Sequence, residues 1–108
     1  MEAYDLVRAG FTASLKGETT SVSFARRALA IDSLYGSAIA LLPIAAYNFR
    51  LNALADSALE RAARQRDRMT PLEQADVDEL AAIRDGDLAA FVRATLRQSR
   101  AESRQGRV

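Results

Sequence analysis

The sequence lacks the two residue types on which most catalytic and metal sites depend. Its 108 residues include no cysteine and no histidine. Without cysteine, neither a disulfide framework nor a thiolate metal site can form. Without histidine, the commonest general base and the usual activator of a hydroxyl nucleophile are missing. We therefore expect a chain that is not an enzyme, with no cofactor, no metal and no small-molecule substrate.

Residues that interrupt helices are also scarce. The chain has two prolines and five glycines, and aromatic residues make up only 6%. Its hydrophobic part is dominated by alanine and leucine, which are strong helix formers, and no segment has the pattern of a β-hairpin. A chain of 108 residues is long enough for one domain with one modest core. The composition predicts a single all-α domain.

No leader, membrane span or dominant charge stands out. Residues 1–5 are acidic and unlike a signal peptide, and the longest apolar run, residues 38–47, is about half as long as a membrane helix requires. Fifteen basic and fourteen acidic residues give a formal charge of +1, which removes the strong positive field typical of nucleic-acid binders. We expect a cytoplasmic protein that binds neither membranes nor nucleic acid.

Six helical segments can be drawn, at about residues 3–16, 20–31, 34–50, 52–67, 71–85 and 88–98. The clearest start is the fifth, where Thr70, Pro71 and Glu73 predict a capping box with proline at the first helical position. Gly86 is expected in the left-handed conformation, and Asp87 is expected to cap the sixth helix.

Three other boundaries carry weaker signals. Asn52 is the expected cap of the fourth helix. Pro43 lies inside the third segment, where it removes a backbone donor, so we expect a kink there, or else a later helix start. Residues 99–108 are polar and basic without an apolar face, so we expect a folded domain over residues 1–98 and a disordered tail.

The segments recur with a period near 34 residues. Moving the second segment by 34 residues places Ala28 on Ala62, and a further 34 carries Ala62 to Leu96. The third segment overlays the fifth at 36 residues, pairing Leu41 with Val77. Such a recurrence is typical of stacked helix pairs. A generic bundle of Ala- and Leu-rich helices with an accidental period is the alternative.

Particular stretches resemble the tetratricopeptide repeat family. Residues 6–11, Leu-Val-Arg-Ala-Gly-Phe, followed by Lys16 and Gly17, resemble its first helix, and residues 25–35 resemble the close of its second. Residues 66–73 leading to 84–87 are similar to repeat regions of bacterial signalling kinases, cyclases and transcriptional activators. The chain departs from the pattern in lacking Trp, in Pro43 and Glu79 where a small glycine is usual, and in Phe91 for a small alanine. The resemblance implies a right-handed, tetratricopeptide-like α-solenoid of antiparallel helix pairs, with about three repeats and six helices over residues 3–98.

The resemblance also implies a scaffold for protein–protein interaction, part of a larger bacterial signalling or regulatory protein. In such repeats the first helix of each pair lines a concave surface that holds a peptide or helix. The implied groove residues are Tyr4, Phe11 and Ser14, then Ala40, Ile44, Tyr47 and Asn48, then Asp76 and Arg84, with Leu80 and Ile83 on the same faces. Tyr47 and Asn48 are the strongest candidates, and ordinary packing between helices is the alternative for each residue.

The sixth segment carries Leu88, Phe91, Val92, Thr95 and Leu96 at the spacing of a stripe laid on a core. A helical stack needs a polar last helix, which the tail does not resemble. We therefore expect Phe91 or Val92 to mark an uncovered end, which either a continuation of the stack or a second copy in a homodimer would cover.

Two other functions compete with the scaffold. Residues 69–86 superficially resemble the opening of bacterial helix-turn-helix DNA-binding regulators, but one long amphipathic segment follows where a short turn and a basic recognition helix belong. A structural spacer or self-association module is the remaining alternative.

Overall fold

The computed structural model describes residues 2–105, which form six α-helices and no strand. In chain order these are α1 (Ala3–Leu15), α2 (Thr20–Ile31), α3 (Gly36–Asn48), α4 (Asn52–Arg64), α5 (Pro71–Asp85) and α6 (Leu88–Gln105), with one short 3-10 helix, η1 (Arg66–Arg68), after α4. The prediction of an all-α chain with six helices is confirmed for the described residues.

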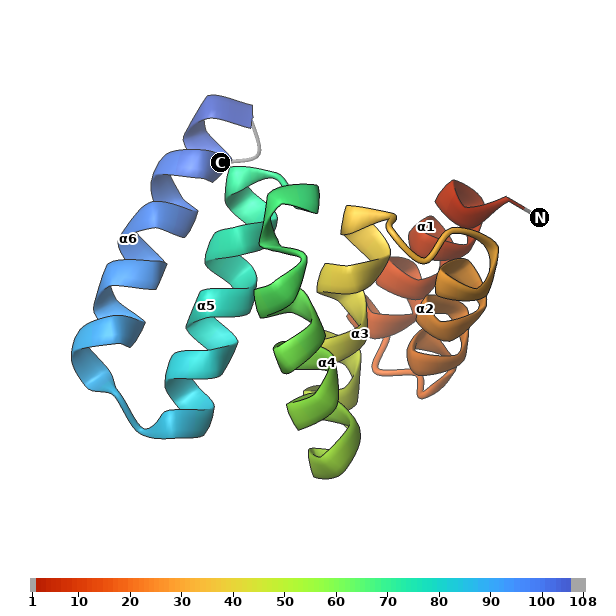
Figure 1. Cartoon of the computed structure of the whole chain (residues 1–108), viewed down its shortest axis with the longest axis horizontal. Coiled ribbons are helices and arrows are strands. Elements are labelled where there is room, and N and C mark those ends of the chain that lie inside the picture. The colour runs from red at the N-terminus through yellow and green to blue at the C-terminus, as the bar shows by residue number, and fades with distance from the viewer. Residues whose placement is uncertain (1, 106–108) are drawn as a thin grey trace.

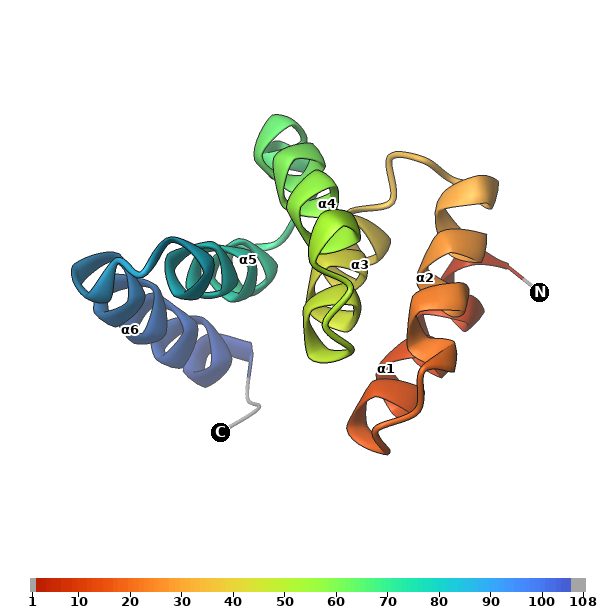
Figure 2. The same cartoon turned by 90° about the horizontal axis from the view of Figure 1, so that it is seen from below.

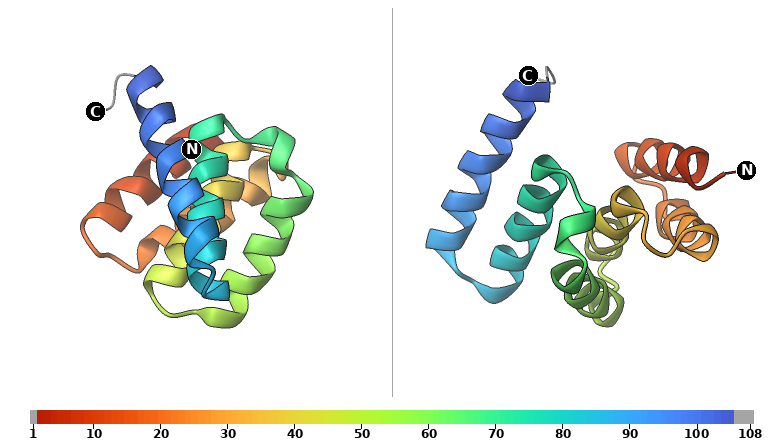
Figure 3. Two further views of the ribbon diagram at one scale, coloured as in Figure 1. Left: turned by 90° about the vertical axis from the view of Figure 1, so that its left-hand side faces the viewer. Right: turned by 45° about the horizontal axis from the view of Figure 1, so that its top comes forward.

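Consecutive helices form three pairs that follow one another across the molecule, from α1/α2 to α5/α6 (Figure 1). The first helices of the pairs lie side by side, because α3 contacts both α1 and α5. The second helix of each of the first two pairs also contacts the first helix of the next pair, α2 against α3 and α4 against α5. The third pair runs obliquely to α3 and α4 (Figures 2 and 3). This contact pattern is consistent with the predicted packing of helix pairs.

The core lies mainly among the first four helices and the inner face of α5. Its largest fully buried side chains include Leu6, Ile39 and Leu41, and most of the residues with no exposed surface are alanines. Ala28 and Ala62, which the sequence period pairs, both have no exposed surface. Gly10 lies close against α3, since a Cβ there would lie 2.7 Å from Cδ2 of Leu41 and would require that side chain to shift. Small side chains thus allow α1, α2 and α3 to nest.

The predicted boundaries of α5 and the start of α6 are confirmed. Thr70 Oγ1 accepts a hydrogen bond from the Glu73 backbone amide at 3.2 Å, and the Thr70 amide donates to Glu73 Oε1 at 2.9 Å. Gly86 ends α5 with φ 68°, and Asp87 Oδ1 accepts from the amide of Ala90 at 3.0 Å. These boundaries depend on contacts within a few residues, which the sequence specifies directly.

Boundaries in the middle of the chain differ from the prediction. Asn52 is the first residue of α4 rather than its cap; Leu51 takes the cap position, and its amide donates to the carbonyl oxygen of Ala46 at 2.9 Å. Helix α3 begins at Gly36 and continues through Pro43, so the later start is wrong. Gly36 lies so close to η1 that a Cβ there would overlap the carbonyl oxygen of Arg68.

The C-terminal prediction needs the largest correction. Helix α6 continues to Gln105, so residues 99–105 of the expected disordered tail are helical, while residues 106–108 lie outside the described range. The predicted stripe is right for Phe91 and Thr95, which are partly buried, and wrong for Leu88, Val92 and Leu96, which are exposed, whereas Ala94 and Ala101 are buried. Ala101 extends the packed face by two turns beyond Ala94, which a search for large apolar residues overlooks. No helix within residues 2–105 is long and apolar enough to cross a membrane.

Candidate functional site: a hollow beside the first helices of the three pairs

A cavity of about 360 Å³ opens where α1, α3 and α5 lie side by side, with one residue contributed by α6. Its lining consists of Phe11, Ser14, Leu15, Ile44, Tyr47, Asn48, Asp76, Glu79, Leu80, Ile83 and Gln98. On α1, α3 and α5 the contributing residues recur at spacings of three and four positions, which places them on one face of each helix. We call this cavity the hollow.

The apolar side of the hollow keeps large side chains partly in contact with solvent. Phe11 is 40% exposed, Tyr47 37% and Ile83 43%, although they come from three different helices. Large apolar side chains that gather around one opening are more informative than the same number scattered singly over a surface. The hollow therefore offers an apolar contact area that the described residues leave uncovered.

The opposite side is acidic and braced by α6. Gln98 Nε2 donates a hydrogen bond to Asp76 Oδ1 at 2.5 Å, and Thr95 Oγ1 donates to Glu79 Oε2 at 3.0 Å. Among the described lining residues Asp76 and Glu79 are the charged ones, so the hollow carries negative charge without a lining arginine or lysine. This charge favours a ligand with a cationic group beside its apolar part.

The structure brings six of the nine predicted groove residues together in the hollow: Phe11, Ser14, Ile44, Tyr47, Asn48 and Asp76. The other three lie elsewhere. Ala40 is 1% exposed in the core, so it cannot contact a partner. Tyr4 is exposed under the guanidinium of Arg8, 5.7 Å from the ring centre.

Arg84 is the third predicted residue outside the hollow. Its Nε lies 2.9 Å from Asp85 Oδ1, and its Nη1 lies 3.7 Å from Asp56 of α4. The hydrogen bond to Asp85 raises the pKa of Arg84, against a smaller effect of burial. Arg84 therefore bridges α4 and α5 and does not line the hollow.

Sequence reasoning missed Leu15, Glu79 and Gln98 as lining residues. Leu15 follows Phe11 by four positions, so helical spacing alone could have found it. Gln98 reaches the hollow from the second helix of the third pair, and its position depends on the α6 register, which the sequence prediction had only partly right. Leu80 and Ile83 lie where the pattern placed them.

The predicted stack end lies near the turn between α5 and α6. Phe91 is partly buried and lines another, apolar cavity of about 320 Å³ with Ile83 and Leu88. Val92 is 48% exposed. Leu88, Val92 and Leu96 are spaced four residues apart and form an exposed apolar row, which we call the α6 row.

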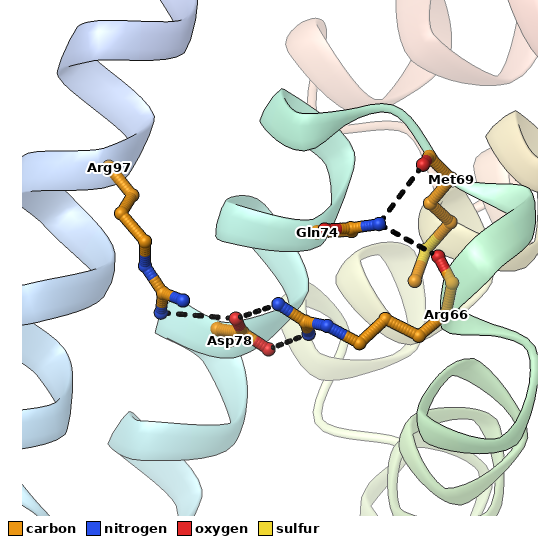
Figure 4. Close-up of polar contacts among 5 residues, drawn as sticks. All are labelled: Arg66, Met69, Gln74, Asp78 and Arg97. Atoms are coloured by element: carbon orange, nitrogen blue, oxygen red, sulfur yellow. Dashed lines mark hydrogen bonds and ion pairs between the residues drawn. The ribbon is translucent and has the colours of Figure 1, made fainter.

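A polar brace on the other side of α5 joins three elements (Figure 4). Arg66 of η1 donates to both carboxylate oxygens of Asp78, at 2.5 and 2.7 Å, and Arg97 Nη2 of α6 lies 3.1 Å from Asp78 Oδ2. Gln74 Nε2 donates to the carbonyl oxygens of Arg66 and Met69 at 3.0 and 3.2 Å. The hydrogen bond to Asp78 raises the pKa of Arg66, partly offset by burial.

Comparisons with protein-family models, curated proteins and solved structures find no match for this chain. Within residues 2–105 no cluster of three or more acidic side chains is arranged to hold a metal ion. The function of the hollow must therefore be argued from its geometry and charge.

Proposed function

We propose that this chain is a tetratricopeptide-like, right-handed stack of three helix pairs that binds a peptide or helical segment of another protein in the hollow. The observation that carries the proposal is the gathering of Phe11, Tyr47 and Ile83, each between 37% and 43% exposed, around one cavity of about 360 Å³. Aromatic side chains at such openings contribute disproportionately to the binding of peptides. The side-by-side contact of α1, α3 and α5 supports the repeat arrangement.

The charge of the hollow narrows the kind of partner. Asp76 and Glu79 stand on one side and apolar side chains on the other. A segment with an apolar anchor next to lysine or arginine would satisfy both sides. The resemblance of residues 66–87 to repeat regions of bacterial regulators supports a cytoplasmic, signalling role for such an interaction.

A peptide-display selection against the whole chain would test the proposal. We expect the selected peptides to combine an apolar residue with a basic one. Replacing Tyr47 and Asn48 by alanine should weaken their binding by about tenfold or more, because truncating an aromatic anchor typically costs over 1 kcal/mol. The matched control is the double replacement of Asp67 and Arg68 by alanine, which removes two exposed neighbours in η1 without changing the net charge. Peptides that bind the Tyr47/Asn48 variant as tightly as the native chain would refute the hollow as the binding site.

Self-association is a second proposal, supported by the α6 row. Leu88 is 75% exposed and Leu96 53%, which is unusual for leucines aligned on one helix face. We propose that a second copy covers this row in the isolated chain. Light scattering should then give a dimer for the native chain and a monomer for Leu96→Glu. A native chain that stays monomeric at high concentration would refute this proposal.

A further inference from the structure

A second cavity, of about 190 Å³, lies between the start of α5 and the C-terminal half of α6. It is separate from the hollow, because none of its described lining residues lines both. The lining consists of Arg66, Pro71, Gln74, Ala75, Arg97, Arg100, Ala101 and Arg104. Four of these eight lining residues are arginines, and none is acidic.

Their positions follow from the extension of α6. Arg97, Arg100 and Arg104 are spaced by three and four residues, which places them on one face, and Arg66 reaches the same cavity from η1. Like charges at this spacing destabilise an isolated helix. The neighbouring small residues Ala75 and Ala101 leave the space between them open.

The charges in this cavity are only partly balanced. Asp78 takes hydrogen bonds or ion pairs from Arg66 and Arg97 (Figure 4). Arg100 and Arg104 make no side-chain hydrogen bond or ion pair with any other residue that the structure describes. The lining contains four guanidinium groups and no carboxylate, and Asp78 pairs with two of the four. Asp78 is held through both of its oxygens, as the planar guanidinium fork holds oxyanions in general.

We propose that this cavity binds a phosphate group, with Arg100 and Arg104 as its main ligands and Arg97 shared with Asp78. A phosphate monoester carries close to two negative charges and three acceptor oxygens, which suits an excess of positive charge better than a single carboxylate does. The arginines surround a small cavity, and the chain as a whole carries a charge of only +1. Both facts favour a discrete phosphate over an extended nucleic-acid backbone. The inference is independent of peptide binding in the hollow.

Calorimetric titration of the whole chain would test the site with two probes. Inorganic pyrophosphate represents a free phosphate compound, and a phosphoserine peptide with its unphosphorylated twin represents a phosphate carried by a protein. We expect saturable binding to at least one probe and none to the unphosphorylated peptide. The probe that binds more tightly identifies whether the phosphate is free or carried by a protein. Absence of binding to both would overturn the proposal.

Paired variants locate the binding. Arg100→Gln with Arg104→Gln should weaken it about tenfold or more, because hydrogen bonds to charged groups are among the strongest in proteins. Arg8→Gln with Arg50→Gln, on α1 and in the turn after α3, makes the same change in net charge and should leave affinity unchanged. Equal losses of affinity in the two double variants would show that the phosphate does not bind in this cavity. Circular dichroism confirms that each variant is folded.

Two further measurements separate a fork-bound phosphate from diffuse attraction. Arg100→Lys with Arg104→Lys keeps the charge but loses the planar fork, and should bind several-fold more weakly; native affinity in this variant would overturn the proposal. A short DNA duplex should bind weakly at physiological salt. Tight duplex binding that depends on Arg100 and Arg104 and falls steeply with salt would replace the phosphate site by a nucleic-acid surface.

Discussion

The first two helix pairs and the third pair are held together by different kinds of contact. Leu41 and Ile39 of α3 are almost completely buried, and the central core draws on every helix from α1 to α5. No described residue of α6 belongs to that core. Instead, α6 packs on α5 through Ala94 and Ala101 and through the hydrogen bonds of Thr95 and Gln98 to carboxylates.

This difference separates stability from binding. Burial of leucine and isoleucine supplies the larger part of the folding free energy, because each such side chain is worth about 1.5–3 kcal/mol. The polar contacts of the third pair contribute less, yet they position charged groups on both sides of α5. Asp76 and Glu79 lie at the hollow, and Asp78 lies among the arginines. The third pair is therefore where the charge of both proposed sites is set.

The sharpest test of the comparison truncates one leucine in each region. Leu41→Ala should lower the free energy of unfolding by about 2–5 kcal/mol, because it leaves a cavity in the core. Leu96→Ala should change it by no more than about 0.5 kcal/mol, since Leu96 is 53% exposed. Urea denaturation of both variants measures the difference. Equal losses would mean that the two regions share one apolar core.

Gly10 tests how closely the first helices must approach. Gly10→Ala should cost about 1–3 kcal/mol, because the new methyl group would meet the side chain of Leu41 in a packed core. Gly17→Ala is the control: it has φ 71° and open space around it, so only the backbone conformation costs about 1 kcal/mol. In a double-mutant cycle, Leu41→Ala should relieve part of the Gly10→Ala penalty. If the two losses of stability simply add, the Gly10→Ala penalty does not arise from contact with Leu41.

The sequence predicts well those boundaries that depend on contacts between residues close together in the chain. The start and end of α5 and the start of α6 depend on contacts between residues at most four apart, namely Thr70 with Glu73, Gly86 with Ala82 and Ile83, and Asp87 with Ala90. Residue type determines such contacts almost alone. Six of the nine groove residues also lie in the hollow, because a helical face follows from spacing once the first helices lie side by side.

What the sequence does not predict depends on packing between helices. The α6 register could not be found from hydrophobicity, because Ala94 and Ala101 are buried while Leu88 and Leu96 are exposed. The side-chain position of Arg84 could not be predicted either, because its contact with Asp56 depends on how α4 lies against α5. Residues 99–105 of α6 contain one apolar residue, Ala101, and a single alanine does not reveal a packed face. The errors on α6 and at Arg84 therefore concern contacts between helices, whereas the errors at the start of α3 and at Asn52 concern helix boundaries.

The capping box of α5 tests a local contact at the border between the two regions. Thr70→Ala should lower the free energy of unfolding by about 1 kcal/mol, the usual value for a lost N-terminal cap. Ser37 of α3 also donates to Glu73 Oε2 at 2.6 Å, so the box is tied to the second pair. Thr70→Ser keeps the cap oxygen and should restore most of the stability in urea denaturation. An unaffected Thr70→Ala variant would show that packing, not capping, sets the start of α5.

The smallest expected effect concerns the brace at Asp78. Its side chain and that of Arg66 are 24% and 41% exposed, so Asp78→Asn should cost less than about 1 kcal/mol of global stability. Locally the change should be clearer, because it leaves the arginines around the second cavity without a counter-charge. Hydrogen exchange should then quicken in the C-terminal half of α6 while α3 keeps its protection, since weakly packed elements open separately from the core. Added salt should reduce the difference by screening the arginines.

Asp67→Asn is the control. It removes an equal charge from an exposed position in η1 and should leave hydrogen exchange in α6 unchanged. If α3 and α6 lose protection together in Asp78→Asn, the third pair is not an independently opening unit, and the contrast between the two regions is one of composition only.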